Sequence, residues 1–202
     1  MKTVVLGTLL ASAALCGACG SSSRVVRTDP ASTEGGDLSG YWNDIDAEQV
    51  AEAMTDQIVA GGWLEDHYRR ADSGERPVVK LMGVIKRTDD RNVNEQYFAK
   101  QLERFLLNTR RVRVVAASGQ DAINVAERDR QAVHASDATA KSQGNEVGAD
   151  YTLQTVINSQ NETDGAGKAV RAYLVNMELV NVETNEKVWI GEKKIRKVVE
   201  RA

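Results

Sequence analysis

Two stretches near the end of the chain constrain the fold most. Residues 170–182 place apolar side chains from Tyr173 to Leu179 at every second position, and residues 187–199 form a further long segment. A period of two is the pattern of a β-strand with one buried face. The polar residues 183–186 between the two stretches are typical of a hairpin turn. The sequence therefore predicts an antiparallel hairpin that ends the domain.

Three further segments are predicted to be strands. Residues 149–159 alternate between apolar and polar side chains, which predicts a strand that joins the hairpin through a turn at residues 161–168. Residues 78–86 are almost continuously apolar, as expected for a strand that is covered on both faces. Residues 112–116 predict a short strand. The last three strands would form a meander.

Helical spacing marks the beginning of the domain. The side chain of Asp46 can cap a first helix, which carries an apolar stripe of Val50, Ala53, Met54 and Ile58. The glycines at residues 61–62 are expected to end this helix. The stripe predicts that one side of the helix packs against the sheet.

Three more helices are expected between the strands. Residues 63–70 predict a short helix, and a third helix is expected to begin after Asn92 or Asn94. Residues 120–144 are polar with alanine as the main apolar residue, which predicts a surface helix. Strands that alternate with helices favour an α/β (α+β) fold. We expect a mixed sheet of about four to five strands flanked by helices, with a C-terminal antiparallel meander.

The chain begins with a targeting segment. The apolar run at residues 4–15 is shorter than the ~20 residues needed to span a bilayer and has the length of a signal-peptide core. Gly17 and Ala18 directly before Cys19 resemble a bacterial lipobox. Cys16 is the alternative lipidation site, although a large leucine precedes it. We predict a signal peptide at residues 1–18 and a lipid-modified Cys19.

A tether is expected to join the lipid to the domain. Several acyl chains, palmitate among them, would hold Cys19 in a membrane, since each buried CH₂ contributes about 0.8 kcal/mol. Gly20 after the cysteine resembles an outer-membrane sorting signal. Residues 19–37 contain little that can be buried and are predicted to be disordered, with a reach of at most ~60 Å. The globular domain then comprises residues 38–202.

The sequence offers few residues for catalysis or metal binding. Both cysteines lie before the domain, so it has no disulfide and no thiolate ligand. His67 and His134 lack neighbours at metal-ligand spacing and are expected at the surface. A net charge of −3 gives no indication of nucleic-acid binding. We predict no catalytic residue, no metal and no cofactor.

Two pairs of acidic residues are candidates for acid–base chemistry. Asp44 lies close to Asp46, and Asp89 is next to Asp90. Such pairs can act in catalysis when burial separates their pKa values. Here their turn-like surroundings favour a helix cap for the first pair and a solvated turn for the second.

Candidate binding residues lie at the two ends of the domain. The last strand carries Lys193, Lys194 and Arg196, which either protect an edge strand from pairing or form a basic strip for an acidic partner. Trp42 stands beside the tether and is either a core residue or an interface anchor. Lys193, Lys194, Arg196 and Trp42 are therefore the candidate partner-binding residues.

Most of the domain resembles a known family of lipoproteins. The segments at residues 38–54, 77–85, 147–159 and 174–197, with the helix around Leu102, look like the LpoB-type activators of penicillin-binding proteins. The most specific parts are Trp42-Asn43-Asp44 and residues 183–194. The family is related in fold to the N-terminal domain of the TolB translocation protein, which implies a mixed sheet flanked by helices.

The resemblance also implies a function. It indicates an outer-membrane lipoprotein that faces the periplasm, binds a bifunctional peptidoglycan synthase and stimulates glycan polymerisation without catalytic residues of its own. Such an activator would work by binding the active synthase conformation more tightly than the inactive one. The alternative is a non-catalytic envelope assembly or secretion lipoprotein that forms an oligomer, and a third possibility is an enzyme.

Overall fold

The computed structural model describes residues 40–71, 74–116, 120–136, 138–141, 146–163 and 168–200. The predicted signal peptide, Cys19 and the tether lie outside these residues. All of the described residues belong to one unit, Gly35–Ala202.

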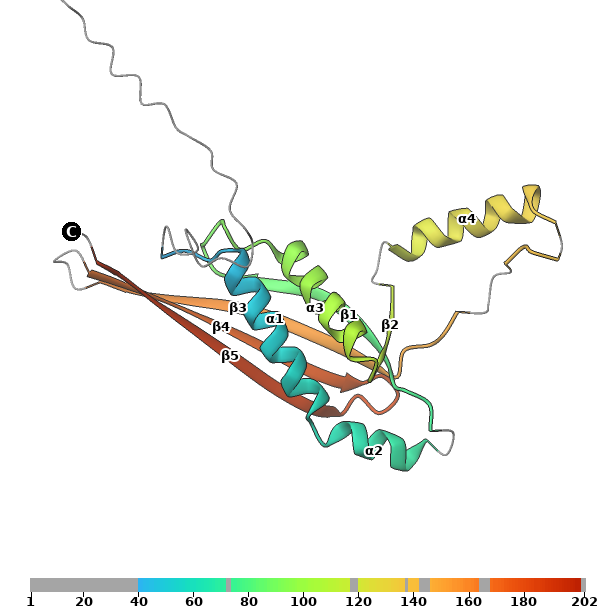
Figure 1. Ribbon diagram of the computed structural model, residues 1–202, viewed down its shortest axis with the longest axis horizontal. Helices are drawn as coiled ribbons and strands as arrows, with labels where there is room; N and C mark the ends of the chain where they lie inside the picture. The colour runs from blue at the N-terminus through green and yellow to red at the C-terminus, as the bar shows by residue number, and fades with distance from the viewer. Residues whose placement is uncertain are drawn as a thin grey trace, which may run out of the picture. The chain divides into compact units, whose positions relative to one another are not determined.

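A five-stranded mixed sheet forms the centre of the domain (Figure 1). The strand order is β2-β1-β3-β4-β5, with β2, β1 and β3 parallel and β4 and β5 antiparallel to their neighbours. The strands are β1 (Val78–Arg87), β2 (Arg113–Val115), β3 (Tyr151–Thr163), β4 (Lys168–Asn181) and β5 (Lys187–Glu200). The predicted mixed α/β fold with its C-terminal meander is confirmed.

Two long helices cover one face of this sheet. The helices are α1 (Asp44–Val59), α2 (Trp63–Arg70), α3 (Glu95–Thr109) and α4 (Gln120–His134). Figure 1 shows α1 and α3 side by side across the strands. Three residues of the predicted stripe of α1 are buried, with Val50, Met54 and Ile58 no more than 1% exposed, and Ala53 is half-buried. The three buried side chains pack against Phe98, Leu102 and the inward side chains of the sheet to form the core.

The first helix begins earlier than predicted. Asn43, and not Asp46, is the N-cap: its Oδ1 accepts a hydrogen bond from the Asp46 amide at 2.9 Å. The Asp46 carboxylate accepts one in return from the Asn43 amide at 3.0 Å. Asp46 thus completes a capping box from inside the first turn. The helix ends at Val59, before the two glycines, as predicted.

The other boundaries follow the sequence with two differences. The second helix has the predicted bounds, and Asn94 caps the third. The polar helix ends at His134, ten residues before its predicted end at residue 144. Residues 142–145 lie outside the described part of the chain. The third strand continues to Thr163, so the predicted turn at 161–168 begins later.

The first strand is covered on one face only. Met82 is 42% exposed and Ile85 is 49% exposed, whereas Val79 is fully buried. The prediction of a strand covered on both faces is therefore wrong. The reason is that α1 and α3 lie on the same face, while α4 does not pack on the other. We call the side of the sheet opposite α1 and α3 the open face.

Candidate partner-binding surface

The pleat of β5 divides the predicted basic strip between the two faces. Lys194 and Arg196 are exposed, whereas Lys193 is half-buried. Lys193 pairs with the buried Val175 and therefore belongs to the face that the helices cover. Lys194 and Arg196 pair with Leu174 and Ala172 on the open face. The structure thus brings two of the three predicted residues together and separates the third.

A third cation lies on the same face. The register across the sheet aligns Arg87, Asn158, Leu174 and Lys194 in one row. Arg87 and Lys194 are separated by three strand spacings, or about 14 Å. Among the residues that the structure describes, no ion pair involves Arg87, Lys194 or Arg196. We call these three residues the basic corner. Sequence reasoning missed Arg87, since only the strand register relates it to β5.

Exposed aliphatic side chains surround the basic corner on the open face. Ile190 is 64% exposed and Val198 is 53% exposed on β5, and Ile85 is 49% exposed on β1. Exposed apolar patches that are rimmed by polar residues mark protein-binding sites. The open face is therefore the best candidate for partner binding in the described domain.

The fifth strand also lies at an edge of the sheet, as the sequence predicted. Its lysine and arginine side chains discourage pairing with another strand. On the helix side, the Gln57 side chain donates a hydrogen bond to the Glu192 carbonyl at 3.3 Å. Edge protection and partner binding by the open-face cations are compatible, because the first uses the edge and the second the face.

Trp42 is a core residue. Its side chain is 3% exposed and makes edge-to-face contacts with Phe98 at 6.2 Å and Tyr173 at 5.4 Å between ring centroids. The expectation that Trp42 anchors a partner is not met, since its ring presents no surface outside the protein. Of the two roles considered for Trp42, core residue and interface anchor, the structure shows the first.

Asp90 is buried beneath Trp42. Its Oδ2 accepts hydrogen bonds from the Trp42 amide at 2.9 Å and the Tyr173 hydroxyl at 2.5 Å, and its Oδ1 accepts one from the Asn92 amide at 2.9 Å. The prediction of a solvated turn at Asp90 is therefore wrong. Burial opposes ionisation, but these hydrogen bonds and the charge of Lys86 outweigh it and lower the pKa of Asp90. Burial and the Asp90 carboxylate raise the pKa of Tyr173.

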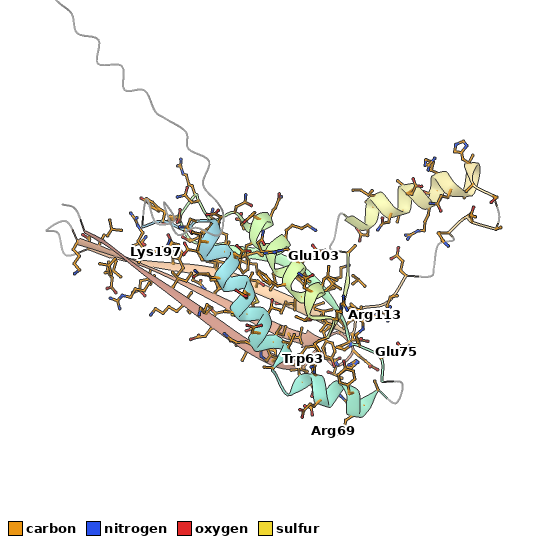
Figure 2. The ribbon with its side chains drawn as sticks, in the orientation of Figure 1. Trp63, Arg69, Glu75, Glu103, Arg113 and Lys197 are labelled. Atoms are coloured by element: carbon orange, nitrogen blue, oxygen red, sulfur yellow. The ribbon has the colours of Figure 1, made fainter. Side chains whose placement is uncertain are left out.

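A buried ion pair lies near this group. The Lys197 ammonium is 2.5 Å from the Asp46 carboxylate, with side chains 9% and 8% exposed, and it donates a hydrogen bond to the Tyr41 carbonyl at 3.0 Å (Figure 2). We call Trp42, Asp46, Asp90, Tyr173 and Lys197 the N-terminal clamp. It fixes the start of the domain to β4 and β5.

The histidines occupy different surroundings. His134 is exposed at the end of α4. His67 is half-buried, with Nδ1 3.1 Å from the Tyr151 hydroxyl, and lines a cavity of about 370 Å³ with Arg70 and Asp150. Within the described ranges, no three side chains among His, Cys, Asp and Glu are grouped to hold a metal ion. None of the helices in that part of the chain has the length and apolar character to cross a membrane.

Solved structures with a similar fold come from several bacteria. The LpoB C-terminal domain from Salmonella enterica is 16% identical, with a TM-score of 0.45, and the match covers 77% of this chain and 99% of that chain. The corresponding domain from Escherichia coli is 18% identical, with a TM-score of 0.43 and coverages of 74% and 98%. These likenesses concern the fold alone. The comparison with curated protein sequences gave no significant match.

The family assignment comes from a sequence model. The model described as "Peptidoglycan-synthase activator LpoB" matches residues 46–195. This range begins within the first turn of α1 and ends within β5, so it includes nearly all of the described domain. The chain therefore belongs to the LpoB family of peptidoglycan-synthase activators.

Proposed function

We propose that this chain is an outer-membrane lipoprotein that binds and activates a bifunctional peptidoglycan synthase, a penicillin-binding protein. Lipid on Cys19 would anchor it, with the domain facing the periplasm, and the domain would act without catalytic residues of its own. The match to the activator family over residues 46–195 is the single observation that carries this proposal.

The basic corner is the proposed contact with the synthase. Lys194 and Arg196 are exposed and support no buried contact, so their charges are available to an acidic surface. Complementary charges steer two proteins together and set their orientation. The neighbouring aliphatic side chains Ile190 and Val198 would supply the apolar part of the interface. Lys193 is not part of this surface.

The N-terminal clamp fixes the point at which the chain enters the domain from the proposed lipid anchor, and this point lies near the basic corner. Lys197 donates a hydrogen bond to the Tyr41 carbonyl on the helix-covered face. Arg196, the preceding residue of β5, points to the open face. A β-carbon added to Gly40 would collide with Val199, so the chain enters the domain in close contact with the end of β5. The start of the domain is thereby fixed at the end of the sheet that carries the basic corner.

Activation would follow from selective binding. A protein that binds the active synthase conformation more tightly than the inactive one shifts the population toward the active one. A tenfold difference in the two affinities corresponds to about 1.4 kcal/mol and can raise the active fraction up to tenfold. The domain need only present a surface that fits one conformation.

The test is recovery of a synthase from the native envelope. The full chain would be used to capture partners from detergent-solubilised membranes, and any synthase recovered would be assayed for glycan polymerisation with and without the chain. The proposal predicts that a synthase is recovered and that its polymerisation rate rises. Recovery of other outer-membrane proteins alone, with no stimulation of a synthase, would contradict it. Light scattering of the same sample would then test the oligomeric assembly function.

A further inference from the structure

The cavity beside His67 lies at the other end of the sheet from the N-terminal clamp. Three elements line it: α2 with His67 and Arg70, the start of β3 with Asp150 and Tyr151, and the turn between β4 and β5 with Glu183. Its volume of about 370 Å³ lies within the range of roughly 300–1,000 Å³ that is typical of small-molecule sites. The proposed synthase contact does not include this cavity.

The fold holds the three elements together at this point. The two lining residues of α2 are three positions apart, which places them on one side of the helix. Strand register pairs Tyr151 with Asn181, and the Val182 amide donates a hydrogen bond to the Asp150 carbonyl at 2.9 Å. The Asn181 side chain accepts a hydrogen bond from the Glu183 amide at 2.9 Å. The turn is therefore fixed against the start of β3.

A buried hydroxyl group belongs to the cavity. Tyr151 is 2% exposed, and its ring makes an edge-to-face contact with Trp63 at 5.1 Å between centroids. Its hydroxyl lies 3.1 Å from His67 Nδ1 and accepts a hydrogen bond from Arg70 Nη2 at 3.5 Å. Burial raises the pKa of Tyr151, while the charge of Arg70 lowers it and that of Asp150 raises it. The hydroxyl is therefore neutral and lies within reach of both charges.

Charges of both signs line the cavity without pairing. Arg70, Asp150 and Glu183 are exposed, and within the described ranges none of the three takes part in an ion pair. One Asp150 oxygen is fixed by the Val78 amide at 2.7 Å. The two carboxylates would repel a ligand that is only an anion, and the guanidinium would repel one that is only a cation. A ligand that carries both charges complements the whole set.

We propose that this cavity binds a small zwitterion, a free amino acid or a dipeptide. Arg70 pairs with the carboxylate of the ligand, a contact that guanidinium geometry favours. Asp150 and Glu183 attract its ammonium group, and the Tyr151 hydroxyl offers a neutral hydrogen-bonding group to its peptide bond. A cavity of 370 Å³ has the volume of about a dozen water molecules, similar to the number of non-hydrogen atoms in a dipeptide.

The proposed site is independent of the basic corner. The corner follows the row of Asn158, whereas the cavity begins at Tyr151. Seven residues along β3 separate the two rows, or ~23 Å. A ligand in the cavity therefore leaves Lys194 and Arg196 accessible, and its binding can be measured without a synthase.

NMR titration of the full chain with L-alanyl-L-alanine tests the proposal. Binding predicts saturable shifts of the backbone amides around the cavity, such as those of Tyr151 and Val182. The N-acetylated dipeptide lacks the ammonium group and the dipeptide amide lacks the carboxylate, so each should bind at least about tenfold more weakly. The absence of saturable shifts with the unmodified dipeptide would overturn the proposal, and so would equal affinities for the three compounds.

Two charge-removing variants test the assigned roles. Arg70→Gln should weaken binding of the unmodified dipeptide at least about tenfold, because a charged hydrogen-bond partner is lost. The matched control is Arg69→Gln on the same helix, since Arg69 pairs with Asp66 at 2.6 Å and does not line this cavity. Its affinity should stay within about twofold of that of the unaltered chain. Equal affinities for the two arginine variants would overturn the proposal.

The second variant, Glu183→Gln, separates a charge effect from a general loss of structure. It should weaken binding of the unmodified dipeptide but strengthen binding of the N-acetylated one, because a carboxylate that repels the anion is removed. Damage to the cavity would weaken both compounds alike, and that result would overturn the role of Glu183 in the site.

Discussion

The two faces of the same sheet differ in what their side chains do. On the helix-covered face, alternate residues such as Leu153, Val175 and Leu179 are no more than 1% exposed and pack under α1 and α3. On the open face, their neighbours include cations without ion pairs and aliphatic side chains that are about half exposed. Adjacent residues of one strand therefore belong to different environments, because the pleat turns them to opposite sides.

This difference separates stability from recognition. Substitutions on the helix-covered face should change the free energy of unfolding, and those on the open face should change partner binding. Three stability predictions test that separation, each with a matched change on the other face or at the surface.

The largest effect is expected in the core. Leu102 is 2% exposed and packs between α1 and the sheet, so Leu102→Ala should lower the free energy of unfolding by about 3 kcal/mol. Ile190→Ala on the open face removes a side chain that is 64% exposed and should cost less than about 0.5 kcal/mol. Urea unfolding measures both. Similar losses in the two variants would break the distinction between the faces.

A slightly smaller effect is expected at the buried ion pair. Lys197→Met leaves the buried Asp46 carboxylate without its ammonium partner and should cost about 2–3 kcal/mol. The control is Lys194→Met in the same strand, where the lysine is exposed and the cost should be below about 0.5 kcal/mol. Thermal and urea unfolding check the pair. A neutral Lys197→Met would show that the N-terminal clamp does not stabilise the domain.

The smallest of the three effects is expected at Tyr173. Tyr173→Phe removes the shortest hydrogen bond to Asp90 and should cost about 1–2 kcal/mol at neutral pH. Because the pKa of Asp90 is lower in the folded state, its ionised carboxylate stabilises the fold when the pH is above the ordinary pKa of 3.8. This stabilisation is lost as the pH falls through the lower pKa of the folded state. Because Tyr173→Phe removes a hydrogen bond that lowers the pKa of Asp90, the free energy of unfolding of the variant should fall less on acidification than that of the unaltered chain. Urea unfolding from pH 7 to pH 3 measures the change, and Tyr68→Phe, near the protein surface, is the control.

Elements with a clear period were predictable from the sequence. The stripe of α1, the bounds of α2 and the C-terminal meander follow from the spacing of apolar residues, which the packing preserves. The start of α1 was not predictable, because Asn43 and Asp46 are both good capping residues. Which of them is the N-cap depends on which backbone amide each side chain reaches.

The site residues were harder to predict because they depend on tertiary contacts. Asp90 looks like a turn residue, and only the fold brings Trp42 and Tyr173, distant in sequence, to its carboxylate. Arg87 joins the basic corner through strand register alone. By contrast, the sequence alone could have assigned Lys193 and Lys194 to opposite faces of the sheet, because successive side chains of a strand alternate between its two faces. Coverage of the first strand failed as a prediction because an apolar run does not reveal where α4 packs.

The basic corner on the open face is the proposed contact with a synthase. The most direct measurement is the dissociation constant of the recovered synthase for the full chain and for the double variant Lys194→Glu with Arg196→Glu. The matched control is Arg69→Glu with Arg91→Glu, two exposed residues outside the sheet, one of which Figure 2 shows on α2, far from Lys197. The account predicts at least about tenfold weaker binding for the first variant, with an unchanged melting temperature, and little change for the control. Equal affinities for both variants and the unaltered chain would contradict it.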